Sequence, residues 1–76
     1  MSGKKRTIIY TYRKMAGLSQ EELARMLQVS QATISQWERG ILRPRWAHLY
    51  LLSRALRIPL SQLVREFGLQ EIDLND

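Results

Sequence analysis

Apolar residues recur along this chain at the spacing of an α-helix, and no segment shows the alternation of apolar and polar residues that is typical of a strand. The clearest stripe comes late, where Leu60, Leu63, Val64 and Phe67 stand at positions i, i+3, i+4 and i+7. Similar patterns predict helices over residues 7–16, about 20–27, 31–39, 46–56 and 59–67. The sequence therefore predicts an all-α fold, a compact domain of five helices.

Capping residues mark where several of these helices begin and end. The run Ser19-Gln20-Glu21-Glu22 is a capping box, in which the Ser19 hydroxyl accepts from the Glu22 amide and the Glu22 carboxylate accepts from the Ser19 amide. Ser30 stands in the same position before the next predicted helix. Glycines stand where three helices are expected to end: Gly17, Gly40 and Gly68.

The helix predicted over 31–39 has an unusual outer face. Its apolar residues are Ile34 and Trp37, which bury only a narrow stripe. The residues left on the outside are Gln31, Ala32, Thr33, Ser35 and Gln36. An outer face that carries amides and hydroxyls but no charge indicates a surface that recognises a pattern of hydrogen bonds.

The chain has 76 residues and no cysteine, so we expect one domain without a disulfide or a thiolate metal site. No apolar run approaches the roughly 20 residues that a membrane span needs. The basic start lacks the apolar segment of a signal peptide. We therefore expect a soluble, cytoplasmic protein with a basic arm (1–6), a helical domain (7–67) and an acidic tail (68–76).

Charge is distributed unevenly around the net value of +5. Residues 1–65 hold all 12 basic residues and three acidic ones, which gives +9. Residues 66–76 hold four acidic residues and no basic one, which gives −4. A helical domain this basic is typical of proteins that bind nucleic acid or another anionic surface.

The sequence offers no catalytic constellation. Its single histidine, His48, lies in an apolar helical stretch, and there is no cysteine to act as a nucleophile. Glu21 and Glu22 are adjacent, so on a helix their side chains diverge by about 100° and cannot share a substrate. The four glycines are far apart and form no phosphate-binding loop. We expect no enzyme activity, no metal and no cofactor.

The segment from Gln20 to Arg39 resembles the 20-residue helix-turn-helix signature. The apolar positions of the signature hold Leu23, Leu27, Val29, Ile34 and Trp37, and Ala24 is the small residue where the two helices cross. The wider match extends over about residues 7–67 and includes Arg13, Gly17-Leu18-Ser19-Gln20-Glu21-Glu22, Trp37-Glu38-Arg39-Gly40 and Pro44. It resembles the Cro/repressor-type, or xenobiotic-response-element, helix-turn-helix family of phage and bacterial regulators.

This resemblance implies a lambda-repressor-like fold whose third helix lies in the major groove of DNA. It places Gln31, Ala32, Thr33 and Gln36 at base-reading positions. The chemistry agrees, because glutamine pairs in bidentate fashion with adenine while alanine and the threonine methyl contact the thymine methyl.

Backbone contacts and one scaffold pair also follow from the resemblance. Gln20 matches a position that binds phosphate at the N-terminus of a helix. Further phosphate candidates are Ser30, Ser35, Arg39, Arg43 and, as a weaker candidate, Arg45. Arg13 and Glu38 match a pair that forms a structural salt bridge, and we interpret both as scaffold.

The sequence departs from the family pattern at several turns and caps. Gln28 and Arg57 replace residues that are usually glycine, and Gln28 would cost about 1 kcal/mol if its turn requires a positive φ. Pro59 stands where a capping serine is usual and is expected in the first turn of the last helix. Arg45 replaces a capping serine or threonine. These departures affect helix boundaries rather than the reading face.

Together these features predict a sequence-specific regulator of transcription that binds double-stranded DNA as a homodimer on a palindromic operator. The alternative is a protein-interaction module of the same fold, such as an antitoxin-like domain. Such a module tends to carry acidic or bulky apolar residues on the outer face of its third helix, and residues 31–39 carry none there.

Several segments keep more than one interpretation. Part of the late stripe must close the core and part can pair with a second copy, so Leu60, Leu63, Val64 and Phe67 are dimer candidates. The run Lys4-Lys5-Arg6 is either a solvated end or an arm that touches DNA. The acidic tail is a solubilising end, an extension of the dimer interface or a contact to another protein. Trp37 is expected in the core, and Trp46 fits the core or a base equally well.

Overall fold

The computed structural model describes residues 5–68, which form five α-helices and no strand. The helices are α1 (Ile8–Met15), α2 (Gln20–Leu27), α3 (Gln31–Glu38), α4 (Trp46–Leu56) and α5 (Leu60–Phe67). The predicted all-α fold of five helices is confirmed, and every boundary lies within one residue of its predicted place. Most of the predicted basic arm and nearly all of the acidic tail lie outside the described residues.

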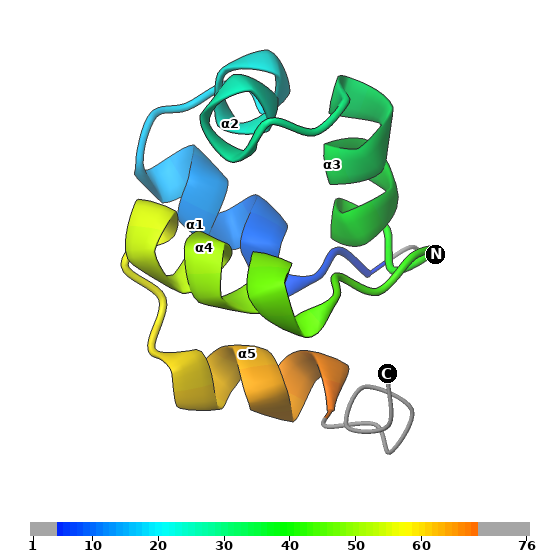
Figure 1. The fold of residues 1–76 in the computed structure, drawn as a ribbon, viewed down its shortest axis with the longest axis vertical. Helices are drawn as coiled ribbons and strands as arrows, with labels where there is room; N and C mark the ends of the chain where they lie inside the picture. The colour runs from blue at the N-terminus through cyan, green and yellow to red at the C-terminus, as the bar shows by residue number, and fades with distance from the viewer. Residues whose placement is uncertain (1–4, 69–76) are drawn as a thin grey trace.

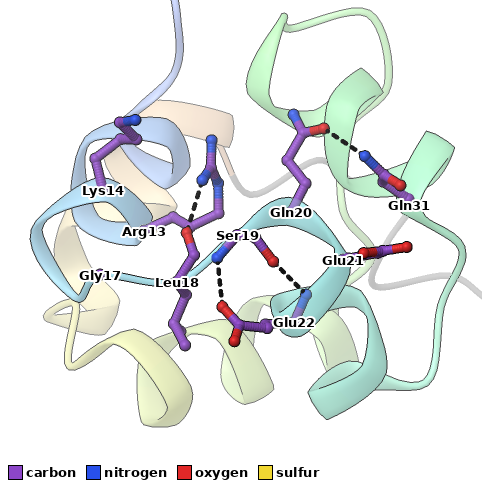
Figure 2. Close-up of a pocket in the computed structure, with 9 residues that line it drawn as sticks. All are labelled: Arg13, Lys14, Gly17, Leu18, Ser19, Gln20, Glu21, Glu22 and Gln31. Carbon is purple, nitrogen blue, oxygen red and sulfur yellow. Dashed lines mark hydrogen bonds between the residues drawn. The ribbon is translucent and has the colours of Figure 1, made fainter.

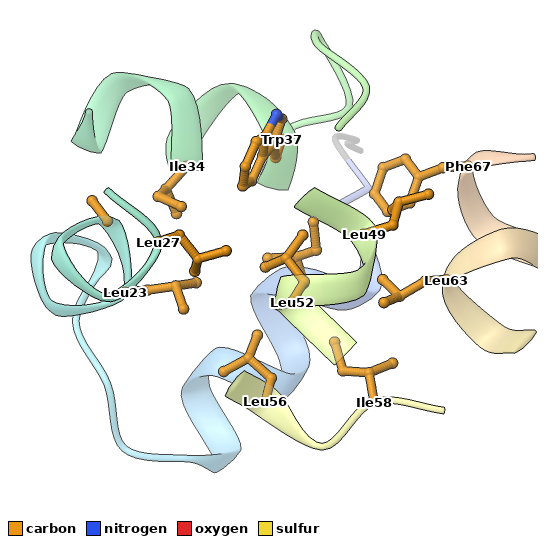
Figure 3. Packing of buried hydrophobic residues seen from close by; sticks show 12 residues of the cluster. Leu23, Leu27, Ile34, Trp37, Leu49, Leu52, Leu56, Ile58, Leu63 and Phe67 are labelled. Carbon is orange, nitrogen blue, oxygen red and sulfur yellow. The ribbon is translucent and has the colours of Figure 1, made fainter. Parts of the chain in front are cut away.

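The helices surround one apolar core. Figure 1 shows α2 and α3 on one side of the pair α1 and α4, with α5 packed on the far side of α4. Figure 3 shows how these helices direct their apolar side chains inward, among them Leu23, Ile34, Trp37, Leu52 and Leu63. A fully buried side chain of this size stabilises the fold by about 1.5–3 kcal/mol. The core therefore fixes the orientation of α3 relative to α2 and α1.

The last helix closes the core, which is one of the two roles expected for its apolar stripe. Leu63 is completely buried and Phe67 is only 8% exposed, so both pack inside the protomer. Leu60 and Val64 are only partly buried. Of the four residues in this stripe, Leu60 and Val64 therefore keep the accessible surface.

Residues in the left-handed conformation end two helices. Gln28 ends α2 with φ 59° and ψ 43°, and Arg57 ends α4 with φ 58° and ψ 43°. The family's glycines are absent at both positions, so the chain adopts a conformation there that costs a residue with a Cβ atom about 1–2 kcal/mol. The condition under which Gln28 was expected to carry a steric cost, a turn with a positive φ, is therefore met.

Pro59 lies just before the last helix rather than in its first turn. It occupies the N-cap position of α5, where its carbonyl accepts from the amides of Gln62 and Leu63. The Tyr12 hydroxyl donates to Gln62 Oε1 at 2.9 Å, which connects α1 to α5. The expected helix therefore begins one residue later, with its first turn joined to α1.

Thr7 is a structural residue that the sequence pattern did not reveal. It is buried, its amide donates to the Glu38 carbonyl at 2.8 Å, and its hydroxyl donates to the Trp37 carbonyl at 2.9 Å. Carbonyls in the last turn of a helix have no partner within the helix. Thr7 donates to two of these carbonyls and thereby fixes the end of α3 to the start of α1.

Candidate nucleic-acid interface

The pair α2 and α3 is positioned by the two serine caps. The Glu22 amide donates to Ser19 Oγ at 3.0 Å and the Ser19 amide donates to Glu22 Oε1 at 2.8 Å, so the predicted capping box is present. Hydrogen bonding of the Glu22 carboxylate to the Ser19 amide first, and to the Ser19 side chain second, lowers the pKa of the Glu22 carboxyl from its ordinary value. Ser30 Oγ accepts from the Thr33 amide at 3.0 Å and caps α3. The two serine caps therefore define the first residues of α2 and α3, Gln20 and Gln31.

The outward face of α3 carries the four predicted base-reading residues. Gln31 and Ala32 are exposed at the start of the helix, and Thr33 and Gln36 are partly exposed. The opposite side, with Ile34, Trp37 and Glu38, is buried. The structure therefore brings the predicted residues together on one face without a charged side chain among them.

A chain of polar contacts runs from the core to this face. Arg13 Nε lies 2.5 Å from Glu38 Oε2, and Arg13 Nη2 donates to Glu38 Oε1 at 3.1 Å. Gln20 Nε2 donates to the same Oε1 at 3.0 Å. Gln31 Nε2 in turn donates to Gln20 Oε1 at 3.2 Å, as Figure 2 shows. Four residues from three helices thus form one connected network.

The buried carboxylate of Glu38 orders this network. Glu38 is 1% exposed and, as a carboxylate facing Arg13, it only accepts hydrogen bonds. The Gln20 amide must therefore turn its nitrogen toward Glu38 and its oxygen toward Gln31. Among the described residues no buried side-chain nitrogen or oxygen lacks a partner. The orientation of Gln31 is consequently set from the core.

Polar and basic residues flank the reading face at both ends. Ser30, before α3, is exposed, and Ser35, within it, is partly exposed. Beyond its end Arg39, Arg43 and Arg45 are exposed, with Arg39 at the C-cap of α3 and Arg45 at the N-cap of α4. An exposed guanidinium beside a reading helix can contact a phosphate of the DNA backbone.

An open pocket lies at the start of α2, beside the reading face. Figure 2 shows Arg13, Lys14, Ser19, Gln20 and Gln31 among the residues around it. Lys14 was not among the predicted site residues, although it directly follows Arg13 in the sequence. A helix N-terminus with a lysine nearby favours an anion such as phosphate.

Basic residues before α1 and in its last turn surround one aromatic ring of that helix. The guanidinium of Arg6 lies 4.6 Å from the centroid of the Tyr10 ring, and the Arg13 guanidinium lies 5.5 Å from it. The Lys14 ammonium lies 6.0 Å from the same centroid. These distances allow cation–π contacts. Arg6, from the predicted arm, is thereby held against α1.

Residues 5–68 contain neither a cluster of metal ligands nor a helix that could span a membrane. No group of three or more His, Cys, Asp or Glu residues there could hold a metal ion. None of the helices in that range is long and apolar enough to cross a membrane. His48 instead packs against Trp37, with ring centroids 5.2 Å apart.

Comparison with known proteins agrees with this arrangement. A search of curated proteins finds no match to the chain. A protein family described as helix-turn-helix matches residues 9–63, which is more than two-thirds of the 76 residues. The matched range includes α2, α3 and α4 and parts of α1 and α5. The chain therefore belongs to the Cro/repressor-type helix-turn-helix family of DNA-binding proteins.

Proposed function

We propose that the protein is a transcriptional regulator that recognises a specific sequence in double-stranded DNA, with α3 in the major groove. The observation that carries this proposal is the uncharged face of α3, on which Gln31 is oriented from the buried Arg13–Glu38 pair through Gln20. A reading surface needs side chains that are held in place before the partner arrives, because ordering them on binding costs affinity.

The geometry of Gln31 leaves the groups that read adenine free to do so. One hydrogen of Nε2 is used by Gln20, and the other hydrogen and Oε1 remain. A glutamine reads adenine by donating from its nitrogen to N7 and accepting at its oxygen from N6. Ala32 and the methyl group of Thr33, next to it, can contact thymine methyl groups.

Ser30, the N-cap of α3, orients the Thr33 side chain for a contact with a thymine methyl group. Its hydroxyl lies 2.9 Å from Ser30 Oγ, so its polar end is used locally. This supports a role for the Thr33 side chain through its methyl group rather than through its hydroxyl.

The regulator is proposed to act as a homodimer on a palindromic operator. Half-sites on one face of DNA lie about 34 Å apart. The protomer spans 34 × 32 × 22 Å, so two copies side by side have dimensions that match this repeat. Leu60 and Val64 are the partly buried apolar residues of α5 that a second copy could contact.

A protein-interaction module of the same fold is the second candidate. The observation that favours it is a group of exposed large apolar residues outside α3: Ile41, Leu42, Trp46, Tyr50 and Leu51. The reading face favours DNA instead, because it carries no acidic residue and no exposed bulky apolar one.

Selection from a pool of randomised duplexes, followed by sequencing, tests the proposal. We expect enrichment of a motif made of two inverted half-sites, and the Gln36→Ala variant should lose preference at one base pair of each. A pool that stays random while the protein still binds it would show that binding does not depend on sequence. Absence of any DNA binding would support the interaction module.

A further inference from the structure

The outer face of α4 is apolar and uncovered among the described residues. Trp46 is 45% exposed, Tyr50 one turn later is 51% exposed, and Leu51 beside it is 43% exposed. One turn further, Arg54 Nη1 donates to the Tyr50 hydroxyl at 3.2 Å. We call these four residues the α4 face. Large aromatic side chains exposed on one helix indicate a contact surface.

The charge around the α4 face determines which partner fits it. The helix that carries this face has Arg45 at its N-cap, Arg54 in its last turn and Arg57 at its C-cap, and residues 45–57 contain no acidic residue. A second copy joined through the same face would bring these arginines against one another, which costs free energy. An occupant with apolar side chains and negative charge fits better.

The chain itself contains such a segment directly after α5. Residues 69–76 carry three apolar residues, Leu69, Ile72 and Leu74, and three acidic ones, Glu71, Asp73 and Asp76, but no basic residue. We propose that residues 69–76 dock in cis on the α4 face, with their apolar side chains against Trp46, Tyr50 and Leu51 and their carboxylates toward Arg54 and its neighbouring arginines.

The place where the described chain ends makes this contact possible. Figure 3 shows Phe67, the last residue of α5, beside Leu49, which directly precedes Tyr50 in α4. Eight residues reach up to about 26 Å, at roughly 3.3 Å per residue. The α4 face from Trp46 to Arg54 is only about 12 Å long, at 1.5 Å per residue. The segment is therefore long enough to cover the face.

Docking within one chain does not require high affinity. A segment joined by a short connection has an effective concentration of about 1 mM near its site, so weak contacts are sufficient. Because part of the attraction is between exposed charges, added salt should weaken it.

Acrylamide quenching of tryptophan fluorescence tests the proposal without DNA. The full chain is compared with a chain shortened to residues 1–68, which keeps every described residue. Trp37 is buried and serves as the internal reference. A Trp46→Phe variant retains only Trp37, so it gives the signal of Trp37 alone, and the difference from the unchanged protein gives the signal of Trp46. We expect the quenching constant of Trp46 to rise on the order of twofold in the shortened chain, because the indole loses its cover. High salt should raise it in the full chain as well.

Charge variants separate docking from a general effect of shortening. Glu71→Lys with Asp73→Lys should raise the quenching of Trp46, and adding Arg54→Glu should reverse most of that rise. Equal quenching in the full and shortened chains would overturn the proposal. Protection that increases with protein concentration in both chains would also overturn it, because a second copy would then cover the face. Neither result affects the DNA selection experiment, which depends on α3.

Discussion

Gln31 Nε2 donates to Gln20 Oε1 at 3.2 Å, so the first residue of α3 is hydrogen-bonded to the first residue of α2. The same Gln20 donates to the buried carboxylate of Glu38. A candidate base-reading side chain is therefore positioned by a residue that is itself a candidate phosphate contact. Backbone contact and base reading should consequently be coupled in this protein.

A double-mutant cycle between Gln20 and Gln31 measures this coupling. Gln31→Ala should reduce discrimination between the selected and a random duplex by about 1–3 kcal/mol. Gln20→Ala should also reduce it, because Gln31 loses the partner that orients it. The double variant should lose less than the sum, with a coupling of about 0.5–3 kcal/mol in binding titrations.

A control pair shows whether that coupling is specific. Ser61 is exposed on α5, and Ser61→Ala should be additive with Gln31→Ala. Additive losses for Gln20 and Gln31 as well would mean that their hydrogen bond does not prepare the reading face.

Arg43 tests the assignment of phosphate contacts. Replacing this exposed arginine by alanine should weaken all duplexes alike, because the phosphate backbone is the same in every sequence. The slope of log K against log salt should become shallower by about 0.9. Arg65→Ala, a change of the same charge on α5, should leave the slope nearly unchanged. If both variants change the slope equally, Arg43 contributes only to the overall charge.

The helices and caps that were predicted correctly from the sequence are determined by residues close to one another along the chain. Capping by Ser19 and Ser30 requires only the next three residues, and the stripe around Leu63 requires only helical spacing. Thr7 was missed because its partners, the carbonyls of Trp37 and Glu38, are about 30 residues away. For a similar reason, helical spacing indicates that Leu63 faces inward, but it does not indicate whether its own chain or a second copy covers it.

The candidate site was predicted in a similar way. The residues that face outward from α3 follow from its period, and the resemblance named Gln20, Arg13 and Glu38. That Gln20 joins Glu38 to Gln31 could not be deduced from spacing, because it depends on how three helices approach each other. Lys14 was missed for the same reason, since its place beside the start of α2 depends on the α1–α2 turn.

Removing one member of the buried pair Arg13 and Glu38 should lower the free energy of unfolding more than replacing both members by apolar residues. Arg13→Met leaves the Glu38 carboxylate buried without its cation, and it should lower the free energy of unfolding by about 3–5 kcal/mol. Adding Glu38→Leu should recover most of that loss, because no charge then remains buried. Arg25→Met, on the exposed side of α2, is the control and should change stability by about 0.5 kcal/mol or less. Urea denaturation measures all three, and a loss for Arg13→Met no larger than the control's would contradict a buried ion pair.

Gln28 offers a test of strain in the turn between α2 and α3. Its φ of 59° is a conformation that glycine adopts without the steric cost that a Cβ atom brings. Gln28→Gly should therefore raise the free energy of unfolding by up to about 1 kcal/mol, less the entropy that glycine adds to the unfolded chain. The amide of Gln28, which donates toward the carbonyls of Ala24 and Arg25, is kept in this variant. Gln28→Ala removes the same side chain beyond Cβ but keeps the strain, so it should bring no gain. A glycine variant that is less stable than the alanine variant in urea would show that relief of strain at this turn is smaller than the entropy cost.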